Sequence, residues 1–390
     1  MNDFKKHFDE TRDLLRFGDF TVATKRIIDF TLDTEQIAFY QKANLLLDWL
    51  DNATEPEEIR GKLHQLLEEL YTALSSKPFK QREKILSATD VKKEYANAAF
   101  ALGPVNLELY EGDIVGLVGE NGNGKTTLLR LLCGELYATA GSITYNFEHN
   151  DLYDLRTKLV YIPQRTDTWR GSMFENLVFT AASYGYSADE NVLVTQLIIA
   201  RLGLRKFRNH SWKSLSSGYK MRFELARMLL RKPKLLLIDE PLANLDILAQ
   251  QTVLEDFRAI AKSPFRPLGI ILSSQQLYEV EKTSDQVIFL KQGLQKNLHE
   301  TLPEILGDEP QPVVLKPFVV EFESKWAQSR LSDALQSLGL ESLQFNGGTY
   351  IATFTGNTTQ KAFLQEVINQ DIPLAYFRNI SNSTRRFFVS

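Results

Sequence analysis

A short glycine-rich segment constrains this chain more than any other stretch. Residues 119–127 read GENGNGKTT and match the pattern G-x-x-x-x-G-K-[ST], in which the backbone wraps closely around a phosphate group. Lys125 can reach the outer phosphate oxygens with a mobile positive charge, and the Thr126 hydroxyl can bind the magnesium that accompanies a nucleotide. We therefore expect a nucleotide-binding site at Gly119, Asn121, Gly122, Asn123, Gly124, Lys125, Thr126 and Thr127.

The segments on either side of this loop have the character that the pattern requires. Residues 113–118 form an apolar run typical of a buried parallel strand. Residues 127–132 are good helix formers, and no helix breaker follows until Gly134. A helix that begins near Lys125 would also direct its positive end at the bound phosphates. The context therefore favours a phosphate site over a chance glycine-rich turn.

A pair of acids follows a second apolar run later in the chain. Residues 235–238 are all leucine or isoleucine, and Asp239 and Glu240 come directly after them. Asp239 is suited to hold magnesium, directly or through water. Glu240 is suited to polarise a water molecule aimed at the γ-phosphate. Alone, such a pair could be a solvated turn, but behind a phosphate loop it predicts hydrolysis of a nucleotide.

Further segments lie between and around these two features. Tyr95 precedes the loop, and the others are 161–164 (YIPQ), 215–219 (LSSGY), 242–246 (LANLD) and 272–275 (LSSQ). With these segments the sequence resembles the ATP-binding cassette (ABC) ATPases over about residues 83–295. The resemblance implies an α/β cassette of the P-loop NTPase type that binds ATP and Mg²⁺ and hydrolyses ATP. Tyr95 stands where such proteins stack an aromatic ring on adenine.

The resemblance also implies a hydrolytic centre with one departure. Glu240 and Gln275 take the catalytic positions, and Gln164 joins Thr126 and Asp239 around the magnesium ion. The family usually has a histidine where Gln275 stands. A glutamine side chain is neutral and cannot carry a proton. We therefore expect ATP binding with slow hydrolysis.

Cassettes of this kind pair head to tail and enclose two ATP molecules. The resemblance implies that Ser216 and Gly218 bind the γ-phosphate held by the partner, and that Asp246 belongs to the D-loop. The family usually has glycine where Ser217 stands and glutamine where Tyr219 stands. The two positions that face the phosphate are kept, so the partner role of this signature segment remains our expectation.

The chain divides by composition into several parts. Residues 1–80 have helical apolar spacing and predict four short helices, arranged as a small bundle or as two helical hairpins. The cassette is expected at 81–298. A proline-bearing linker at 299–312 precedes residues 313–390. That last segment has a β-α-β-β-α-β pattern, which suggests a small α+β domain of the ferredoxin-like type.

Charge, hydropathy and cysteine content indicate which partners and which cellular compartment to expect. The formal net charge is −4, and no basic patch interleaved with aromatic residues stands out, so no nucleic-acid partner is expected. No apolar run is long enough to cross a bilayer, and the start of the chain lacks a signal-peptide core. The single cysteine, Cys133, rules out an internal disulfide framework. We expect a cytoplasmic chain, peripheral at the inner face of the cell membrane.

Two functions remain open at this point. The first is the ATP-binding and ATP-hydrolysing subunit of an ABC transporter, which would pair as a homodimer or as a heterodimer with a related cassette. Such a dimer would drive a separate multi-span membrane subunit docked against residues 164–179. The alternative is a soluble ABC ATPase that acts as an ATP-dependent clamp or regulator on a macromolecular partner. Analogy with the family favours the transporter.

Overall fold

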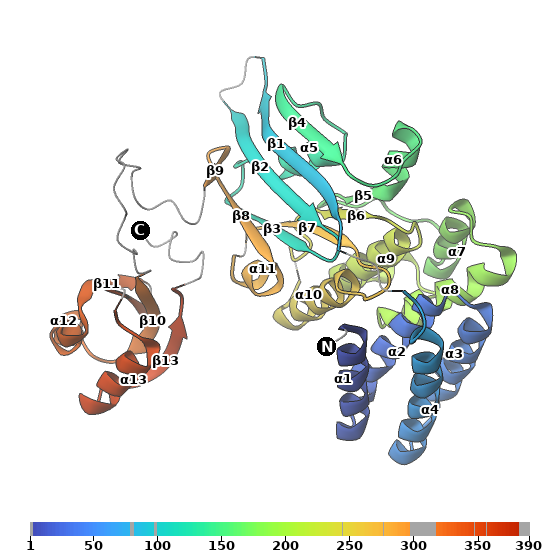
Figure 1. Cartoon of the computed structure of the whole chain (residues 1–390), viewed down its shortest axis with the longest axis horizontal. Coiled ribbons are helices and arrows are strands. Elements are labelled where there is room, and N and C mark those ends of the chain that lie inside the picture. Colours follow the sequence, from blue (N-terminus) through green and yellow to red (C-terminus); the bar gives the residue numbers. More distant parts are fainter. Residues whose placement is uncertain are drawn as a thin grey trace. The chain divides into compact units, whose positions relative to one another are not determined.

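The computed structural model of the chain divides into two compact units, Met1–Lys296 and Asn297–Ser390 (Figure 1). It describes residues 3–78, 82–96, 100–243, 245–275, 277–296, 317–346, 348–355 and 357–381. The linker predicted at 299–312 falls outside these described residues. The first unit contains the phosphate loop together with the helices that precede it.

A six-stranded, mostly parallel sheet forms the centre of the first unit. Its strands run in the order β5-β6-β7-β3-β8-β9, and β9 pairs antiparallel with β8. β3, β6 and β7 are buried along their whole length, which explains their continuous apolar sequences. The strands are β3 (Ile114–Val118), β5 (Leu159–Ile162), β6 (Leu235–Ile238), β7 (Gly269–Ser274), β8 (Gln286–Lys291) and β9 (Leu294–Lys296).

A second, antiparallel sheet has the strand order β2-β1-β4. Buried and exposed residues alternate over most of β2, as expected for a sheet with one face on a core. Its inner face shares an apolar core with β3 and with α5, the helix after the phosphate loop. The strands are β1 (Lys84–Glu94), β2 (Ala101–Tyr110) and β4 (Ala140–Tyr145), and α5 spans Lys125–Leu132.

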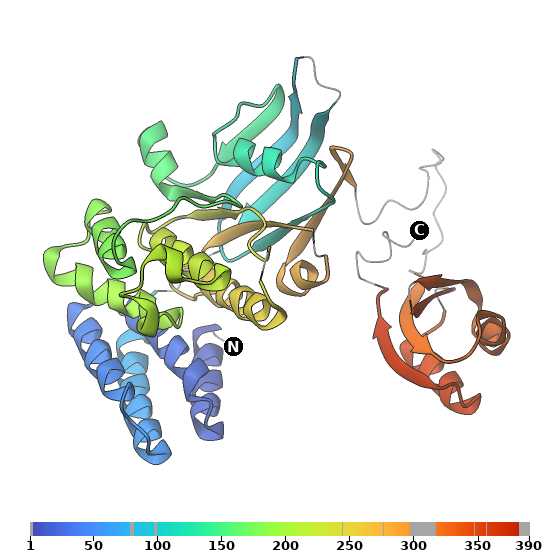
Figure 2. The ribbon, with the colours of Figure 1, turned by 180° about the vertical axis from the view of Figure 1, so that it is seen from behind.

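The remaining helices of the cassette connect and cover the parallel sheet (Figure 2). Two of them, α7 and α8, begin with a capping box in which a serine and the glutamate three residues later satisfy each other's backbone N–H groups. The α-helices are α6 (Leu152–Lys158), α7 (Met173–Ser183), α8 (Ala188–Arg201), α9 (Ser217–Leu229), α10 (Ile247–Ala261) and α11 (Leu277–Thr283). Two short 3-10 helices are η1 (Arg205–Phe207) and η2 (Trp212–Ser214).

Four helices precede the cassette, as the apolar spacing predicts. The turn between the first two uses Gly18 at a φ of 82°, and Asp19 caps the second by accepting a bond from the N–H of Val22. Pro56 opens the fourth helix, where a missing N–H costs nothing. The helices are α1 (Asp3–Phe17), α2 (Phe20–Thr34), α3 (Ile37–Leu50) and α4 (Pro56–Leu74).

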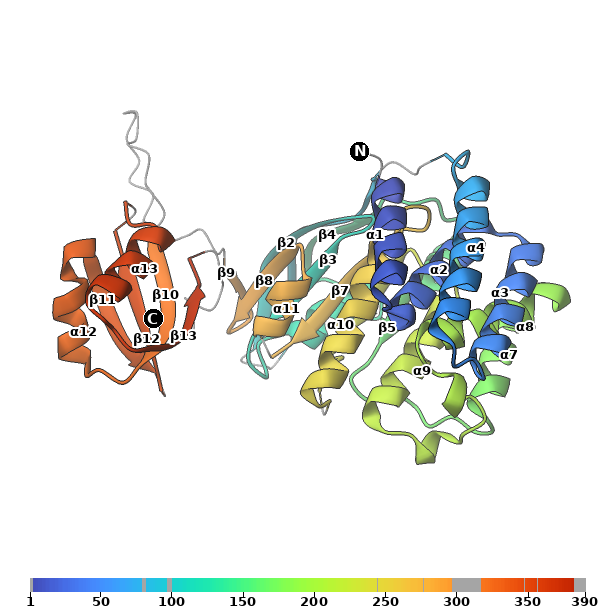
Figure 3. The same ribbon diagram turned by 90° about the horizontal axis from the view of Figure 1, so that it is seen from below.

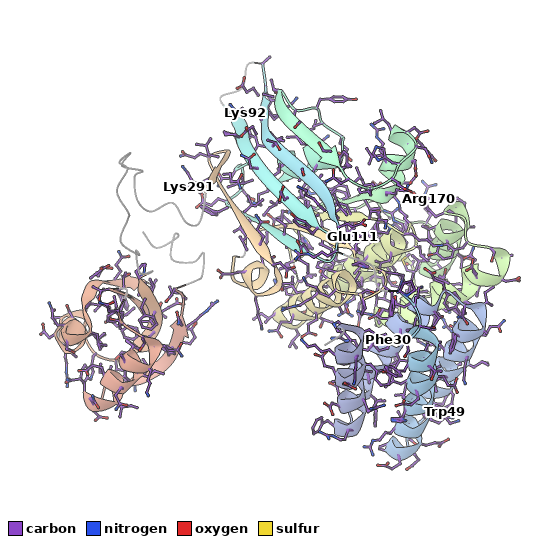
Figure 4. All side chains as sticks on the ribbon, viewed as in Figure 1. Phe30, Trp49, Lys92, Glu111, Arg170 and Lys291 are labelled. Atoms are coloured by element: carbon purple, nitrogen blue, oxygen red, sulfur yellow. The ribbon has the colours of Figure 1, made fainter. Side chains whose placement is uncertain are left out.

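These four helices pack on the cassette and share its apolar core (Figure 3). Phe4 contacts Phe30 of α2, which Figure 4 labels, and lies edge-on to Phe265 of the cassette with ring centroids 5.2 Å apart. Buried charges also cross this boundary. The Arg201 guanidinium lies 2.8 Å from Asp29 on α2 and 2.8 Å from Asp256 on α10. The helical segment and the cassette are therefore joined by apolar packing and by ion pairs.

In its described residues, the second unit has a four-stranded antiparallel sheet and two α-helices. The strand order is β11-β12-β10-β13. Its core contains the fully buried rings of Phe322, Phe354 and Phe363. The elements are β10 (Phe318–Ser324), α12 (Gln328–Leu335), η3 (Gln336–Leu338), β11 (Leu340–Asn346), β12 (Thr349–Phe354), α13 (Gln360–Asn369) and β13 (Leu374–Asn379).

Candidate nucleotide-binding site

The phosphate loop connects β3 to α5 and needs glycine at particular places. A Cβ on Gly119 would lie 2.4 Å from the carbonyl oxygen of Leu290, which leaves no room for a side chain. Gly124 has a φ of +96°, and Gly122 has a φ of +82°, conformations that glycine adopts without strain. The Asn123 side-chain oxygen accepts a bond from the backbone N–H of Gln292 at 2.8 Å. The loop is therefore held against the turn between β8 and β9.

Lys125 lies inside the loop and not in solvent. Only 5% of the residue is exposed, and its Nζ donates to the carbonyl oxygens of Gly119 (2.7 Å) and Glu120 (3.2 Å). The same nitrogen forms an ion pair with Glu240 Oε1 at 3.2 Å. A buried ammonium that is already oriented by fixed dipoles is well placed to bind a phosphate.

Thr126 and Asp239, two of the three residues predicted to bind magnesium, are in contact in the structure. Thr126 is the second residue of α5 and Asp239 follows β6, and Thr126 Oγ1 donates to Asp239 Oδ2 at 2.7 Å. Asp239 is 3% exposed. Both groups are hard oxygen donors of the kind that Mg²⁺ prefers, and they lie beside the loop that would hold the phosphates.

Two residues that the sequence reasoning did not assign complete the surroundings of Asp239. Ser273, near the end of β7, donates to Asp239 Oδ1 at 2.6 Å and accepts the backbone N–H of Glu240 at 2.9 Å. The Tyr161 hydroxyl donates to Asp239 Oδ2 at 3.3 Å. Burial and the charge of Asp239 both raise the pKa of Tyr161, which keeps that hydroxyl a donor. Their position at the carboxyl ends of neighbouring strands was the available signal.

Glu240 has an unusual backbone for a residue with a side chain. Its φ is +50°, in the left-handed region that few non-glycine residues occupy. The bond from its N–H to Ser273 and the ion pair with Lys125 hold this conformation. Strained backbone of this kind concentrates at functional sites. The turn directs the carboxylate back towards the phosphate loop.

Other predicted residues lie at the periphery of this site. Gln164 follows β5 and Gln275 follows β7, and both are exposed at the edge of the sheet where the phosphate loop also lies. Asn121 is exposed in the loop, and Thr127 is half-buried in the first turn of α5. Tyr95 follows β1, is 40% exposed, and has the Lys93 ammonium 5.4 Å from its ring centroid.

The signature segment and the D-loop form a second cluster. Ser216 caps α9 by accepting the N–H of Tyr219, and Asp246 caps α10 by accepting the N–H of Ala249. A Cβ on Gly218 would lie 3.6 Å from Ala249, so the starts of the two helices touch. Among the described residues, no hydrogen bond or ion pair joins Ser216, Gly218 or Asp246 to the phosphate loop. Within the described part of one chain, these caps therefore bind their own helices and not Lys125.

Comparison with known proteins agrees with this geometry. Residues 102–243 match the family model described as ABC transporter. The chain carries an ATP-binding cassette. A phosphonates import ATP-binding protein, PhnC of Treponema denticola, is 28% identical over 58% of this chain and 92% of that protein. A lactococcin-A transport/processing ATP-binding protein, LcnC of Lactococcus lactis, is 28% identical over 72% of this chain but only 40% of its own length.

A solved structure supports the same fold for the cassette. The cbiO1 protein of Clostridium perfringens, part of the ABC transporter complex cbiONQ, superposes with a TM-score of 0.51 and 24% identity. The match covers 55% of this chain and 88% of that protein. The predicted α/β cassette is thereby confirmed. Cassettes of this family generally bind ATP with magnesium and hydrolyse it. No helix among the described residues of this chain is both long and apolar enough to span a bilayer.

Proposed function

We propose that this chain is the ATP-binding and ATP-hydrolysing subunit of an ABC transporter, and that it works at the cytoplasmic face of a membrane. The observation that carries the proposal is the convergence of two pairs from distant parts of the sequence. Lys125 contacts Glu240 at 3.2 Å, and Thr126 contacts Asp239 at 2.7 Å. An ammonium, a hydroxyl and two carboxylates at one end of a phosphate loop match the needs of phosphoryl transfer to water.

The binding roles follow from these contacts. Lys125 and the backbone N–H groups of 119–124 bind the outer phosphates, and Tyr95 stacks on the base. Thr126 and Asp239 hold the magnesium ion, with Gln164 as a further ligand from the loop after β5, the strand next to β6. The metal supplies charge neutralisation on the phosphate oxygens when it is bound.

Glu240 is the proposed general base. Its carboxylate accepts a proton from the attacking water, and its left-handed backbone keeps it beside Lys125. Gln275 is proposed to donate a hydrogen bond to the γ-phosphate from the end of β7. Because an amide lacks the positive charge of an imidazolium, we infer that hydrolysis is slow.

A dimer is proposed because, in the described part of the chain, the signature cluster forms no hydrogen bond or ion pair with its own phosphate loop. Ser216 and the N–H of Gly218 would bind the nucleotide of a second cassette at the positive end of α9. Ile247 and Leu248, which follow Asp246, are 70% and 75% exposed. Large apolar side chains at the start of α10 would be covered by such a partner.

A separate membrane subunit is the second proposed partner. It would dock on residues 164–179, which run from the loop after β5 into α7. Phe179 on α7 is 73% exposed, an apolar anchor of the kind that protein interfaces use. The transported substrate and the direction of transport are not part of this proposal.

We also propose the domain boundaries 1–80, 81–298, 299–312 and 313–390, with a ferredoxin-like fold for the last. The order β-α-β-β-α-β with neighbouring strands antiparallel supports that fold. Deletion of 313–390 should leave ATP affinity unchanged, because the nucleotide contacts all lie in the first unit. Loss of affinity in a folded truncation would contradict the boundary.

A clamp or regulator acting on a macromolecular partner is the second candidate function. Gln275 in place of a histidine is the observation that favours it, since a clamp tolerates slow turnover. Affinity purification of the tagged chain from detergent-solubilised membranes separates the two. Enrichment of one multi-span protein, lost in Phe179→Asp but kept in the control Phe17→Asp, would support transport. Recovery only with non-membrane proteins would support the clamp.

A further inference from the structure

A cavity of about 460 Å³ lies between the helices α2 and α3 and the cassette. Its walls come from α2, α3, α8 and α10 and from the loops before β6 and β7. Lys234 and Leu268 line it and directly precede those strands. The cavity therefore lies at the amino edge of the parallel sheet, opposite the nucleotide site. Its volume is within the range of small-molecule sites, which also favour junctions between structural units.

One wall of this amino-edge cavity presents hydrogen-bond donors. Arg266 donates from Nε to Asp33 at 2.6 Å and from Nη2 to the Asp29 carbonyl at 3.5 Å, and Nη1 has no partner among the described residues. Arg266 lines the cavity, and 41% of its side chain is accessible. Lys232 adds an ammonium that lies 4.2 Å from the ring centroid of Tyr186.

Two tyrosines face the same space. Tyr40 is 5% exposed and Tyr186 is half-buried, and neither hydroxyl has a hydrogen-bond partner among the residues that the structure describes. Burial raises the pKa of Tyr40 to about 12, and Arg266 opposes that change. Burial also raises the pKa of Tyr186, again with Arg266 opposing. Both hydroxyls are therefore neutral, and together with Arg266, which lines the same cavity, they can donate hydrogen bonds to a ligand there.

Acidic groups line the cavity as well. Glu190 uses Oε2 in the capping box of α8, which leaves Oε1 outside those bonds. Glu35 ends α2 and pairs with Lys77 at 3.3 Å through Oε2. Both carboxylates line the same cavity as Tyr40 and raise its pKa. Asp29 also lines the cavity, but it is already paired with Arg201 at 2.8 Å.

The rest of the wall is apolar. Leu32, Val194, Ile260 and Phe265 line it, from three helices and one loop. The lining thus combines two tyrosine hydroxyls and an apolar surface with charged groups of both signs, namely Arg201, Lys232, Lys234 and Arg266 against Asp29, Glu35 and Glu190. These are the complements of a carboxylate, an ammonium group and an apolar side chain.

We propose that the amino-edge cavity binds a free α-amino acid with an apolar side chain. Its carboxylate accepts bonds from Arg266, Tyr40 and Tyr186, its ammonium faces Glu190, and its side chain packs on the aliphatic wall. Because the ligand contacts both α2–α3 and the cassette, its binding ties the leading helices to the ATPase. The site is separate from the nucleotide site. Failure of this proposal would therefore leave the proposed function untouched, and failure of the proposed function would leave this proposal untouched.

The test uses the full chain without nucleotide and three matched probes. L-phenylalanine carries both charged groups, 3-phenylpropionate lacks the ammonium, and L-phenylalaninamide lacks the carboxylate. Calorimetric titration should detect L-phenylalanine or L-leucine at millimolar concentrations, with each truncated probe at least about tenfold weaker. The thermal midpoint of the chain should rise with the concentration of the amino acid that binds.

Variants of the tyrosines locate the binding. The double variant Tyr40→Phe/Tyr186→Phe should bind at least about tenfold more weakly, because it loses two donors to a carboxylate. The control Tyr137→Phe/Tyr153→Phe removes two hydroxyls from residues that are 81% and 80% exposed, and should change nothing. Retained ATP binding would show that the double variant is folded. The proposal is overturned if neither amino acid binds the parent chain, if 3-phenylpropionate binds as well as L-phenylalanine, or if the double variant binds normally.

Discussion

Buried charges occur at both edges of the parallel sheet, but they are arranged differently. At the carboxyl edge, Lys125 is held by two carbonyl oxygens and by Glu240, and Asp239 accepts bonds from hydroxyls. At the amino edge, Arg201 lies between two aspartates, and Lys25 pairs with one of them at 3.0 Å. The first arrangement leaves groups that a nucleotide can bind, whereas Arg201, Lys25 and the two aspartates neutralise one another.

The difference shows that this fold places the nucleotide site at one edge of the sheet and the ion pairs that attach the leading helices at the other. Polar groups on loops at the carboxyl edge can exchange partners when a nucleotide arrives. The amino-edge ion pairs join α2 to α8 and α10, three helices far apart in sequence. Removing one member of such a group leaves uncompensated buried charge. Mutations at the two edges should therefore have separable effects, on activity at one edge and on stability at the other.

The carboxyl edge should show the largest effect. Glu240→Gln removes the proposed base and keeps the shape of the side chain, so hydrolysis should fall about a thousandfold. ATP binding should remain, and a dimer should persist in size-exclusion chromatography with ATP and magnesium. Glu135→Gln, an exposed acid that pairs with Arg130, is the control. Unimpaired hydrolysis in a strictly monomeric Glu240→Gln chain would contradict both the base and the dimer.

The amino edge should lose stability and keep its chemistry. Arg201→Met keeps the length of the side chain but leaves Asp29 and Asp256 with too little positive charge. The free energy of unfolding should fall by about 3 kcal/mol, measured by urea titration of the full chain. Arg130→Met breaks an exposed pair and should cost less than about 1 kcal/mol. A large loss of ATP affinity in folded Arg201→Met would show that the two edges are not separable.

A smaller effect is expected for binding at the carboxyl edge. Lys125→Ala removes a charged donor to phosphate, so ATP affinity should fall by about tenfold to a hundredfold. Fluorescence titration with a nucleotide analogue measures it. Lys84→Ala, which removes only a pair with the exposed Glu108, should bind as the parent does. Equal affinity in Lys125→Ala and the parent would exclude the assigned phosphate site.

Sequence alone predicted the carboxyl edge far better than the amino edge. The carboxyl edge is built from contiguous motifs, namely the loop, the acid pair and their flanking strands. The residue types within each short motif are enough to indicate its chemical role. Ser273 was missed because its role depends on β7 lying beside β6, a strand order that a single sequence does not reveal. Arg201 and Asp29 are 172 positions apart, and charged residues are usually exposed, so nothing local marked them as a buried pair.

The smallest expected effect concerns Gln275, which occupies a position where a positively charged side chain could speed hydrolysis at the carboxyl edge. It lies exposed at the end of β7, close in sequence to the Ser273 that orients Asp239 and Glu240. Its amide can donate a hydrogen bond to the γ-phosphate, but it cannot add positive charge as charge shifts on the transferred group. Gln275→His restores only that charge, so turnover should rise about tenfold with little change in ATP affinity. Gln286→His, at the start of β8 on the other edge of the sheet, is the matched control. If the parent chain already hydrolyses ATP at about ten turnovers per second, a typical enzyme rate, and the histidine adds nothing, glutamine is sufficient at this position and the proposal of slow hydrolysis is wrong.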